Sequence, residues 1–235
     1  MKKLFVSLFL FYFVYASEYY AKLEPYDSFI VKAAVAGKIE YINLNTLGKI
    51  VDNETIIQMD DKLDNIELKY SMQKLQSLEE MLNIEEKNYD SIKNLSSKSL
   101  LEKDTQKIKT INIQTQVLDL KIKIATLQDK ITNKKLIEQN KYIHEINVKV
   151  GEYVNAGTLL YSAMDFSKGK LEFFIPIEEA NTIKEKLIYI DGEKTDLKIN
   201  KLYQLADFTN ISSYKCEIVL KNPNHFSKLH KIEFR

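Results

Sequence analysis

The stretch from Lys49 to Val150 contains no glycine and no proline, although six glycines and three prolines lie elsewhere in the chain. Glycine and proline are the residues that most often turn a chain or interrupt a helix. A segment this long without either residue is typical of long helices. The rest of the chain must therefore be organised around a long helical insertion.

The two flanks of this stretch carry the same motif. The first copy runs from Leu47 to Ile57 and the second from Val150 to Leu160. Both read apolar, Gly, any residue, apolar, Val, three variable residues, Thr, and two apolar residues. The repeat predicts two halves of one small β-domain, separated in sequence by the helices.

Strand patterns accompany both copies. Residues 29–44 are rich in β-branched and aromatic residues, which predicts strands, and Ile143 to Gly151 alternates between apolar and polar residues. Turns are expected where glycine permits positive φ angles. The glycines expected at turns of the two halves, with Gly37 at a turn or a close backbone approach, are Gly37, Gly48, Gly151 and Gly157.

Two helices are predicted inside the insertion. The first runs from about Lys62 to Leu95, with an apolar stripe made by Leu68, Met72, Leu75, Leu78, Leu82, Tyr89 and Ile92. A polar cluster around Ser96 predicts a turn, and the second helix should span about Leu100 to Asn133. Each helix would extend roughly 50 Å. Helices of this length must project from a small β-domain as an antiparallel hairpin.

The second helix carries two apolar series. One has coiled-coil spacing and consists of Ile113, Val117, Leu120, Ile124, Leu127 and Ile131. The other, on a neighbouring face, consists of Ile108, Ile111, Leu118, Ile122 and Ala125. Two interpretations remain open at this point. Either one broad face packs on the first helix, or the second series contacts a neighbouring subunit.

Residues beyond Asp165 predict a separate module. Strands are expected at residues 170–176, 187–190, 197–205, 214–220 and 229–234, with a short helix from Glu178 to Lys186 and a hairpin turn at Asp191–Glu193. Residues 18–27 read as a further extended segment. Several short strands with one helix suggest a small β-barrel.

The N-terminus predicts export. A basic start, Met1–Lys3, precedes an apolar run from Leu4 to Tyr15, and Ala16 ends a suitable signal-peptidase site. An uncleaved anchor and a buried core helix are the alternatives. The formal charge is +1 for the whole chain and −1 without residues 1–16, which hold two lysines and no acids. A nearly neutral chain gives no electrostatic basis for nucleic-acid binding.

The sequence contains no pattern typical of catalysis. The single cysteine, Cys216, fits a small apolar core residue, and the three histidines and five methionines show no metal-binding spacing. We therefore expect no catalytic residue, no cofactor and no metal. One enzyme-related alternative is a lipoyl or biotinyl carrier, in which Lys62 would be the modified lysine. A second alternative is a coiled-coil scaffold protein of the periplasm.

In the order of its segments the chain resembles the bacterial periplasmic adaptors, or membrane-fusion proteins of the HlyD and RND type, of tripartite efflux and type I secretion systems. The segments that carry the resemblance are residues 36–39, 48–51, 57–60, 151–160 and 174–180. It implies an α+β fold with a split lipoyl-like β-domain, interrupted by a long antiparallel α-helical coiled-coil hairpin and followed by a small β-barrel domain. The implied boundaries are 1–16 for the signal peptide, 28–61 and 136–165 for the lipoyl-like domain, 62–135 for the hairpin, and 17–27 with 166–235 for the β-barrel domain.

The resemblance also implies partners. Such adaptors are periplasmic, sit at the inner membrane on an RND or ABC pump, form a hexameric ring or a trimer of dimers, and meet an outer-membrane channel with their hairpin tips. The residues expected to dock the channel are Ser91, Ile92, Leu95, Ser97, Leu100, Leu101 and Glu102. Those expected to pack subunits together are Ile111, Leu118, Ile122 and Ala125. Ser91 and Glu102 stand where the family's tip motif has Arg and Ser, so the identity of the channel stays open. No residue pattern identifies the cargo.

Overall fold

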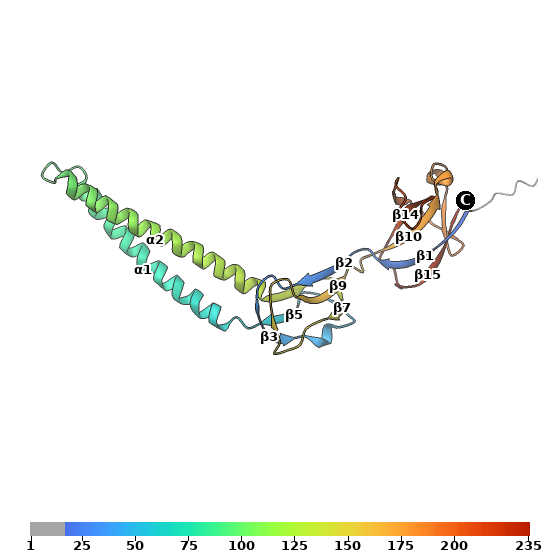
Figure 1. Ribbon diagram of the computed structural model, residues 1–235, viewed down its shortest axis with the longest axis horizontal. Coiled ribbons are helices and arrows are strands. Elements are labelled where there is room, and N and C mark those ends of the chain that lie inside the picture. The colour runs from blue at the N-terminus through green and yellow to red at the C-terminus, as the bar shows by residue number, and fades with distance from the viewer. Residues whose placement is uncertain (1–16) are drawn as a thin grey trace, which may run out of the picture. The chain divides into compact units, whose positions relative to one another are not determined.

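The structure, a computed structural model, describes residues 17–235 and divides them into two compact units (Figure 1). One unit combines residues 17–29 with 164–235, and the other comprises residues 30–163. The predicted signal peptide, residues 1–16, lies outside the described residues. Within residues 17–235, no helix has both the length and the apolar character needed to cross a membrane.

The first unit is built on a seven-stranded sheet with β1 at its centre. Its strands, in spatial order, are β12 (Glu193–Lys194), β11 (Ile188–Ile190), β15 (Leu229–Phe234), β1 (Ser17–Pro25), β10 (Lys168–Pro176), β14 (Ser213–Lys221) and β13 (Ile199–Leu202). Strand β1 pairs antiparallel with both β15 and β10. The N-terminal and C-terminal segments of the chain therefore share one sheet.

Alternation along these strands buries one face of the sheet. In β10 the residues Leu171, Phe173 and Ile175 are buried while their neighbours are partly exposed. Cys216 is fully buried beside this core, as expected for a small apolar residue, and burial raises its thiol pKa to about 12. The hairpin turn expected at Asp191 is present, with positive φ angles at Asp191 and Gly192.

The predicted helix from Glu178 to Lys186 is wrong. Two 3₁₀ turns replace it, η2 (Ile177–Glu179) and η3 (Ile183–Glu185). Glu179 accepts hydrogen bonds from the side chains of Ser17 and Tyr19, at 2.5 and 2.9 Å, while Ile183 is buried in the core. The tighter turns allow both contacts to form.

The second unit contains two four-stranded sheets. One has the order β2 (Ser28–Lys32), β9 (Leu159–Met164), β7 (Lys141–Ile146), β4 (Ile50–Val51). The other has the order β6 (Lys135–Glu138), β5 (Glu54–Met59), β3 (Gly37–Ile42), β8 (Tyr153–Val154), and η1 (Leu44–Thr46) follows β3 in the chain.

The two motif copies are interleaved in these sheets. Strand β4 of the first copy pairs with β7, and β8 of the second copy pairs with β3. Residues from both sides of the helices, such as Ile39, Ile56, Ile143 and Leu160, share one fully buried core. The strands before and after the helices therefore fold together.

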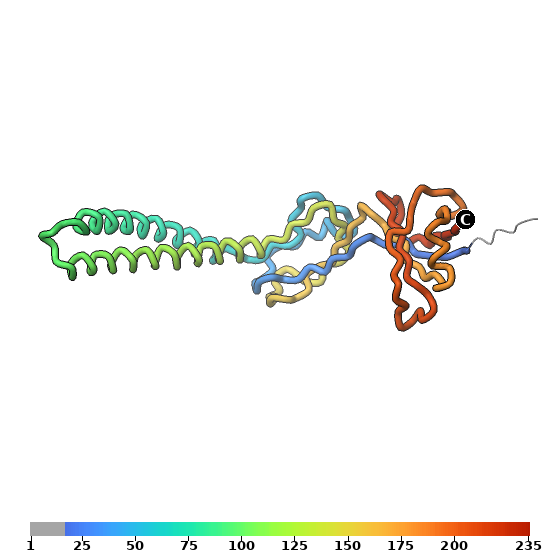
Figure 2. Tube along the Cα trace, turned by 90° about the horizontal axis from the view of Figure 1, so that it is seen from above, coloured from blue at the N-terminus to red at the C-terminus, as the bar shows by residue number. Residues whose placement is uncertain are grey.

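Two helices lie between β5 and β6 in the sequence of this unit. Helix α1 spans Lys62–Ile92 and α2 spans Leu100–Asn133, close to the predicted ranges. The helices lie side by side and antiparallel, and both views show them extending away from the sheets (Figure 2). At 1.5 Å per residue they are about 46 and 51 Å long.

Three of the four expected turn glycines have positive φ angles, namely Gly48 (74°), Gly151 (91°) and Gly157 (88°). Gly37 is different, because it is the buried first residue of β3 and is not among the glycines with positive φ. A Cβ atom there would lie 3.4 Å from Met59 Sδ and 3.5 Å from Lys134 Cε. Gly37 therefore permits a close approach, and its assignment as a turn glycine is corrected.

Candidate docking surfaces of the helical hairpin

The inner face of α2 is the series with coiled-coil spacing. Its residues Ile113, Val117, Leu120, Ile124 and Leu127 are buried, with exposed fractions of 4–8%, and Ile131 is half-buried. The neighbouring residues Ile108, Ile111, Leu118 and Ile122 are 48–66% exposed, and Ala125 is also exposed. The interpretation that one broad face packs on the first helix is therefore wrong, since only one series packs on α1.

The inner face of α1 follows the same heptad spacing but is partly polar. Leu68, Leu75, Leu78 and Leu82 contribute to the packed cluster between the helices. The buried residues of α1 follow one another at intervals of seven and are Asp64, Ser71, Leu78 and Glu85. Met72, which the sequence analysis placed in the apolar stripe, is 51% exposed and lies off this face.

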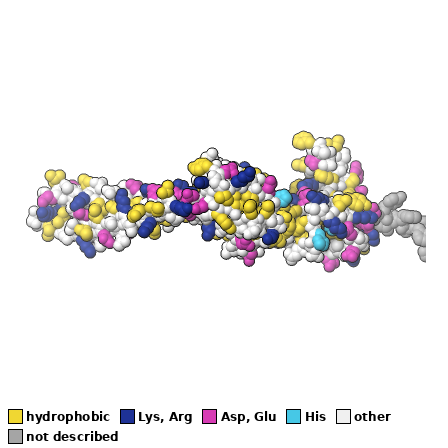
Figure 3. All heavy atoms as spheres, turned by 90° about the horizontal axis from the view of Figure 1, so that it is seen from below, with side chains coloured by type: hydrophobic (Ala, Val, Ile, Leu, Met, Phe, Trp, Pro, Cys, Tyr) yellow, Lys and Arg dark blue, Asp and Glu magenta, His cyan; other side chains and the backbone are white. Residues whose placement is uncertain are grey.

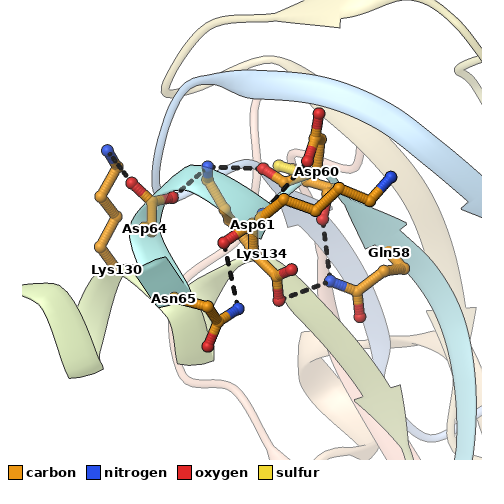
Figure 4. A network of polar contacts seen from close by, with 9 residues as sticks. Gln58, Asp60, Asp61, Asp64, Asn65, Lys130 and Lys134 are labelled. Atoms are coloured by element: carbon orange, nitrogen blue, oxygen red, sulfur yellow. Dashed lines mark hydrogen bonds and ion pairs between the residues drawn. The ribbon is translucent and has the colours of Figure 1, made fainter. Parts of the chain in front are cut away.

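A charged network holds the base of the hairpin (Figure 4). Lys130 and Lys134 approach the buried Asp64 carboxylate from opposite sides. Lys130 Nζ donates a hydrogen bond to Asp64 Oδ1 at 2.7 Å, and Lys134 Nζ donates one to Asp64 Oδ2. Lys134 Nζ also donates to the Asp60 carbonyl oxygen at 2.7 Å. Burial alone would raise the pKa of Asp64, but the two lysines outweigh it and hold that pKa below its ordinary value. The network ties together α1, the end of α2 and the short segment between β5 and α1.

A second polar cluster crosses the hairpin nearer its tip. Glu85 of α1 accepts a hydrogen bond from Gln106 Nε2 at 2.6 Å and pairs with Lys109 Nζ at 2.5 Å. These two partners lower the pKa of the Glu85 carboxyl. Thr110 Oγ1 donates to the Glu85 carbonyl oxygen at 3.3 Å. A shift of one helix along the other would break these contacts, so the cluster favours the observed register.

The tip of the hairpin exposes apolar side chains. Leu95, Leu100 and Leu101 are 45%, 75% and 76% exposed. Ile92 closes α1 and is half-buried, while Ser91 and Ser97 are exposed. The structure thus brings the predicted tip residues together at one end of the hairpin, within residues 91–102 around the turn.

Glu102, which is also expected at the docking surface, makes local contacts at the start of α2. Its carboxylate accepts from the Ser99 backbone N–H at 2.9 Å, while Ser99 Oγ accepts from the Glu102 N–H at 3.2 Å. This is a capping box, which starts α2. The Ser99 N–H and Lys98 lower the Glu102 pKa to about 2. The sequence signal for this cap is Ser99 followed three residues later by Glu102.

The outer surface of the hairpin mixes apolar and charged side chains (Figure 3). On α2 it carries the expected packing residues Ile111, Leu118, Ile122 and Ala125. On α1 the exposed apolar residues are Leu63, Ile66, Tyr70, Met72, Met81 and Ile84. Both helices therefore present apolar side chains that the hairpin itself does not cover.

The lysine of the carrier alternative is placed differently from a carrier lysine. Lys62 is the first residue of α1 and its Nζ pairs with Glu40. Carrier domains need that lysine on a hairpin tip between strands, whereas here a helix begins at it. Among residues 17–235 no cluster of three or more histidine, cysteine or acidic side chains could hold a metal ion.

Comparison with known proteins gives structural matches only. No protein-family model matches the sequence, and no curated protein matches it. MacA from Actinobacillus actinomycetemcomitans matches with a TM-score of 0.70 at 17% identity, over 94% of this chain and 78% of that one. A MacA chimera containing the Pseudomonas aeruginosa MexA α-hairpin domain gives 0.69 at 15% identity, over 94% and 82%.

A membrane fusion protein from Streptococcus pneumoniae R6 gives a TM-score of 0.68 at 9% identity, over 93% of this chain and 98% of that one. All three matches cover nearly the whole of this chain. At such low identity the likeness defines the fold. The chain has the fold of the membrane fusion, or periplasmic adaptor, proteins, in agreement with the resemblance of its sequence motifs.

Proposed function

We propose that this protein is a periplasmic adaptor that links an inner-membrane efflux or secretion pump, of RND or ABC type, to an outer-membrane channel. The observation that carries the proposal is the group of exposed leucines at the tip of the hairpin. Leu100 and Leu101 are about three-quarters exposed and are the first two residues of α2, next to the turn that joins the helices. Apolar side chains displayed at such a position form a surface suited to a partner.

The contacts between the helices support a stiff hairpin. Besides the buried leucines, Glu67 pairs with Lys123 at 2.7 Å and Glu79 with Lys121 at 2.8 Å. We take the two helices as a coiled coil, the two interleaved sheets as a split lipoyl-like domain, and the seven-stranded sheet as a β-barrel domain. Such a protein acts by its geometry and needs no catalytic group.

In this proposal Leu95, Leu100 and Leu101 dock the channel, with Ser91, Ile92 and Ser97 around them. Glu102 contributes indirectly, because its carboxylate caps α2 and so fixes the direction in which Leu100 and Leu101 point. Truncation of an anchor residue in an interface typically costs 1 kcal/mol or more of binding free energy.

The outer apolar residues support assembly of several copies. Ile111, Leu118, Ile122 and Ala125 of α2 would pack on the exposed apolar residues of α1 in a neighbouring copy. Such a contact joins two different surfaces and closes into a ring when the rotation permits. We propose a hexameric ring or a trimer of dimers. A coiled-coil scaffold without a transport partner is the second candidate, since the same outer residues would serve it.

Substitution at the tip distinguishes these candidates. Leu101→Asp, expressed in cells that lack the native copy, should abolish export of a fluorescent substrate, because a charge at the docking surface opposes burial. The matched control is Leu205→Asp, since Leu205 is 86% exposed but lies outside the hairpin, between β13 and β14. Circular dichroism should give equal melting temperatures for both variants. Unchanged export with Leu101→Asp would exclude the tip as a docking surface and favour the scaffold.

A further inference from the structure

One face of the seven-stranded sheet carries two pairs of like charges on β10 and β14. The antiparallel register places Glu172 opposite Glu217 and Lys168 opposite Lys221. Like charges directly opposite each other on neighbouring strands destabilise a sheet. Each pair therefore requires compensating charges nearby.

The glutamate pair is compensated within the chain. Glu172 is paired with Lys215 at 2.9 Å and with Lys170 at 3.4 Å. Glu217 accepts a hydrogen bond from Asn200 Nδ2 at 2.5 Å and lies 4.0 Å from Lys201 Nζ. Both carboxylates of the pair, those of Glu172 and Glu217, therefore have hydrogen-bond donors or lysine partners nearby.

The lysine pair has no such compensation. Lys198, which directly precedes β13 on the far side of β14, adds a third positive charge at the same end of the sheet. Lys168, Lys198 and Lys221 line one hollow of about 350 Å³ together with Tyr26, Ile199, Asn200 and Val219. No acidic residue lines it, and within residues 17–235 none of the three lysines forms an ion pair.

We propose that this hollow binds a phosphate group, held by Lys168, Lys198 and Lys221. Two ammonium groups from the neighbouring strands β10 and β14, and a third from the residue before β13, supply the charge that a phosphate dianion requires, and lysine binds phosphate as a point charge. Tyr26 forms one wall, with Lys168 Nζ 5.5 Å from its ring centroid. The volume accommodates a phosphate with a small substituent. The site belongs to the first unit alone and does not depend on the adaptor function.

Calorimetric titration of the full chain with inorganic phosphate at low ionic strength tests the site. Loss of two lysines in Lys168→Gln/Lys221→Gln should raise the dissociation constant at least about tenfold, since one charge contact contributes roughly a factor of five. The matched control is Lys22→Gln/Lys69→Gln, which makes the same change in net charge at exposed lysines elsewhere. We expect less than a twofold change there.

Thermal unfolding provides an independent measurement. In phosphate-free buffer, Lys168→Gln/Lys221→Gln should melt no lower than the wild type, because it removes repulsion between opposite lysines. At equal concentration, phosphate should raise the melting temperature of the wild type more than that of this variant. Equal dissociation constants in the two double variants, or no phosphate binding by the wild type, would overturn the proposal.

Vesicles distinguish the sources of the phosphate. Wild-type protein is mixed with phosphatidylcholine vesicles with and without phosphatidic acid, and sedimented. Binding that requires phosphatidic acid and is lost in Lys168→Gln/Lys221→Gln identifies a lipid head group as ligand. Calorimetric binding of free phosphate without vesicle binding identifies a soluble phosphate ester. Failure of both kinds of binding contradicts the site.

Discussion

The inner face of the hairpin buries two carboxylates, Asp64 and Glu85, whereas its outer face exposes Ile111, Leu118 and Ile122. The usual amphipathic pattern would place these residues the other way round. The buried carboxylates have lysine partners from the other helix, so they specify how the helices align. The exposed apolar residues contribute nothing to that alignment. The comparison indicates that the inner face sets the shape of the hairpin, whereas the outer face leaves apolar side chains uncovered, as the proposed assembly requires.

The largest effect is expected from breaking the charged network at the base. Asp64→Ala leaves Lys134, 8% exposed at its side chain, without its counter-charge, and loss of one partner of a buried pair typically costs about 3–5 kcal/mol. Glu67→Ala is the matched control, because the Glu67–Lys123 pair is half exposed and contributes at most about 1 kcal/mol. Chemical denaturation measures both. Equal losses would show that Asp64 does not fix the inner face.

Leucine truncations on the two faces of α2 should differ in kind. Leu120→Ala on the inner face should cost about 2–4 kcal/mol of unfolding free energy, since Leu120 is 8% exposed. Leu118→Ala on the outer face should cost less than about 0.5 kcal/mol, since Leu118 is 55% exposed.

In sedimentation experiments the outer-face substitutions should have the larger effect. Leu118→Ala, and more strongly Ile122→Asp, should weaken self-association while the fold stays intact. An unaltered sedimentation profile for Ile122→Asp would indicate that the outer series does not join subunits.

A smaller effect is expected from acid at the tip. The folded-state pKa of Glu102 is about 2, below its ordinary 4.5, so its contribution to the cap is present above pH 4.5 and is lost as pH falls toward about 2. Amide exchange at residues 100–103 should therefore accelerate in this window. In the Glu102→Gln variant this acceleration should be absent, because glutamine accepts the same hydrogen bonds without titrating. A Glu102 titration midpoint near 4.5 would show that the carboxylate is free for a partner.

Both helices and most strands could be predicted because their apolar residues recur with a clear period. The buried half of the hairpin was less predictable, since Asp64, Ser71 and Glu85 occupy core positions with polar side chains. Their spacing of seven or fourteen residues was the available signal, but apolar periodicity alone overlooks it. Apolar periodicity also places Met72 on the inner face, because methionine is apolar, whereas its side chain is 51% exposed.

The turns around Glu179 could not be predicted from local sequence. They depend on hydrogen bonds to Ser17 and Tyr19, which lie about 160 residues away in the chain. Long-range partners therefore decide these turns. The Glu102 cap is different, because it follows the local pattern of Ser99 with Glu102 three residues later, which apolar periodicity does not detect.

Cross-linking from the hairpin tip tests the central claim most directly. A photoactivatable maleimide on Ser97→Cys reports what the tip touches, and Cys216 can be kept because it is buried and its thiol pKa is about 12. Lys69→Cys, on the exposed surface near the base of α1, is the control position. We predict that the tip probe captures an outer-membrane channel in intact cells and that the base probe does not. Capture of only further copies of this chain from Ser97→Cys would contradict the adaptor function.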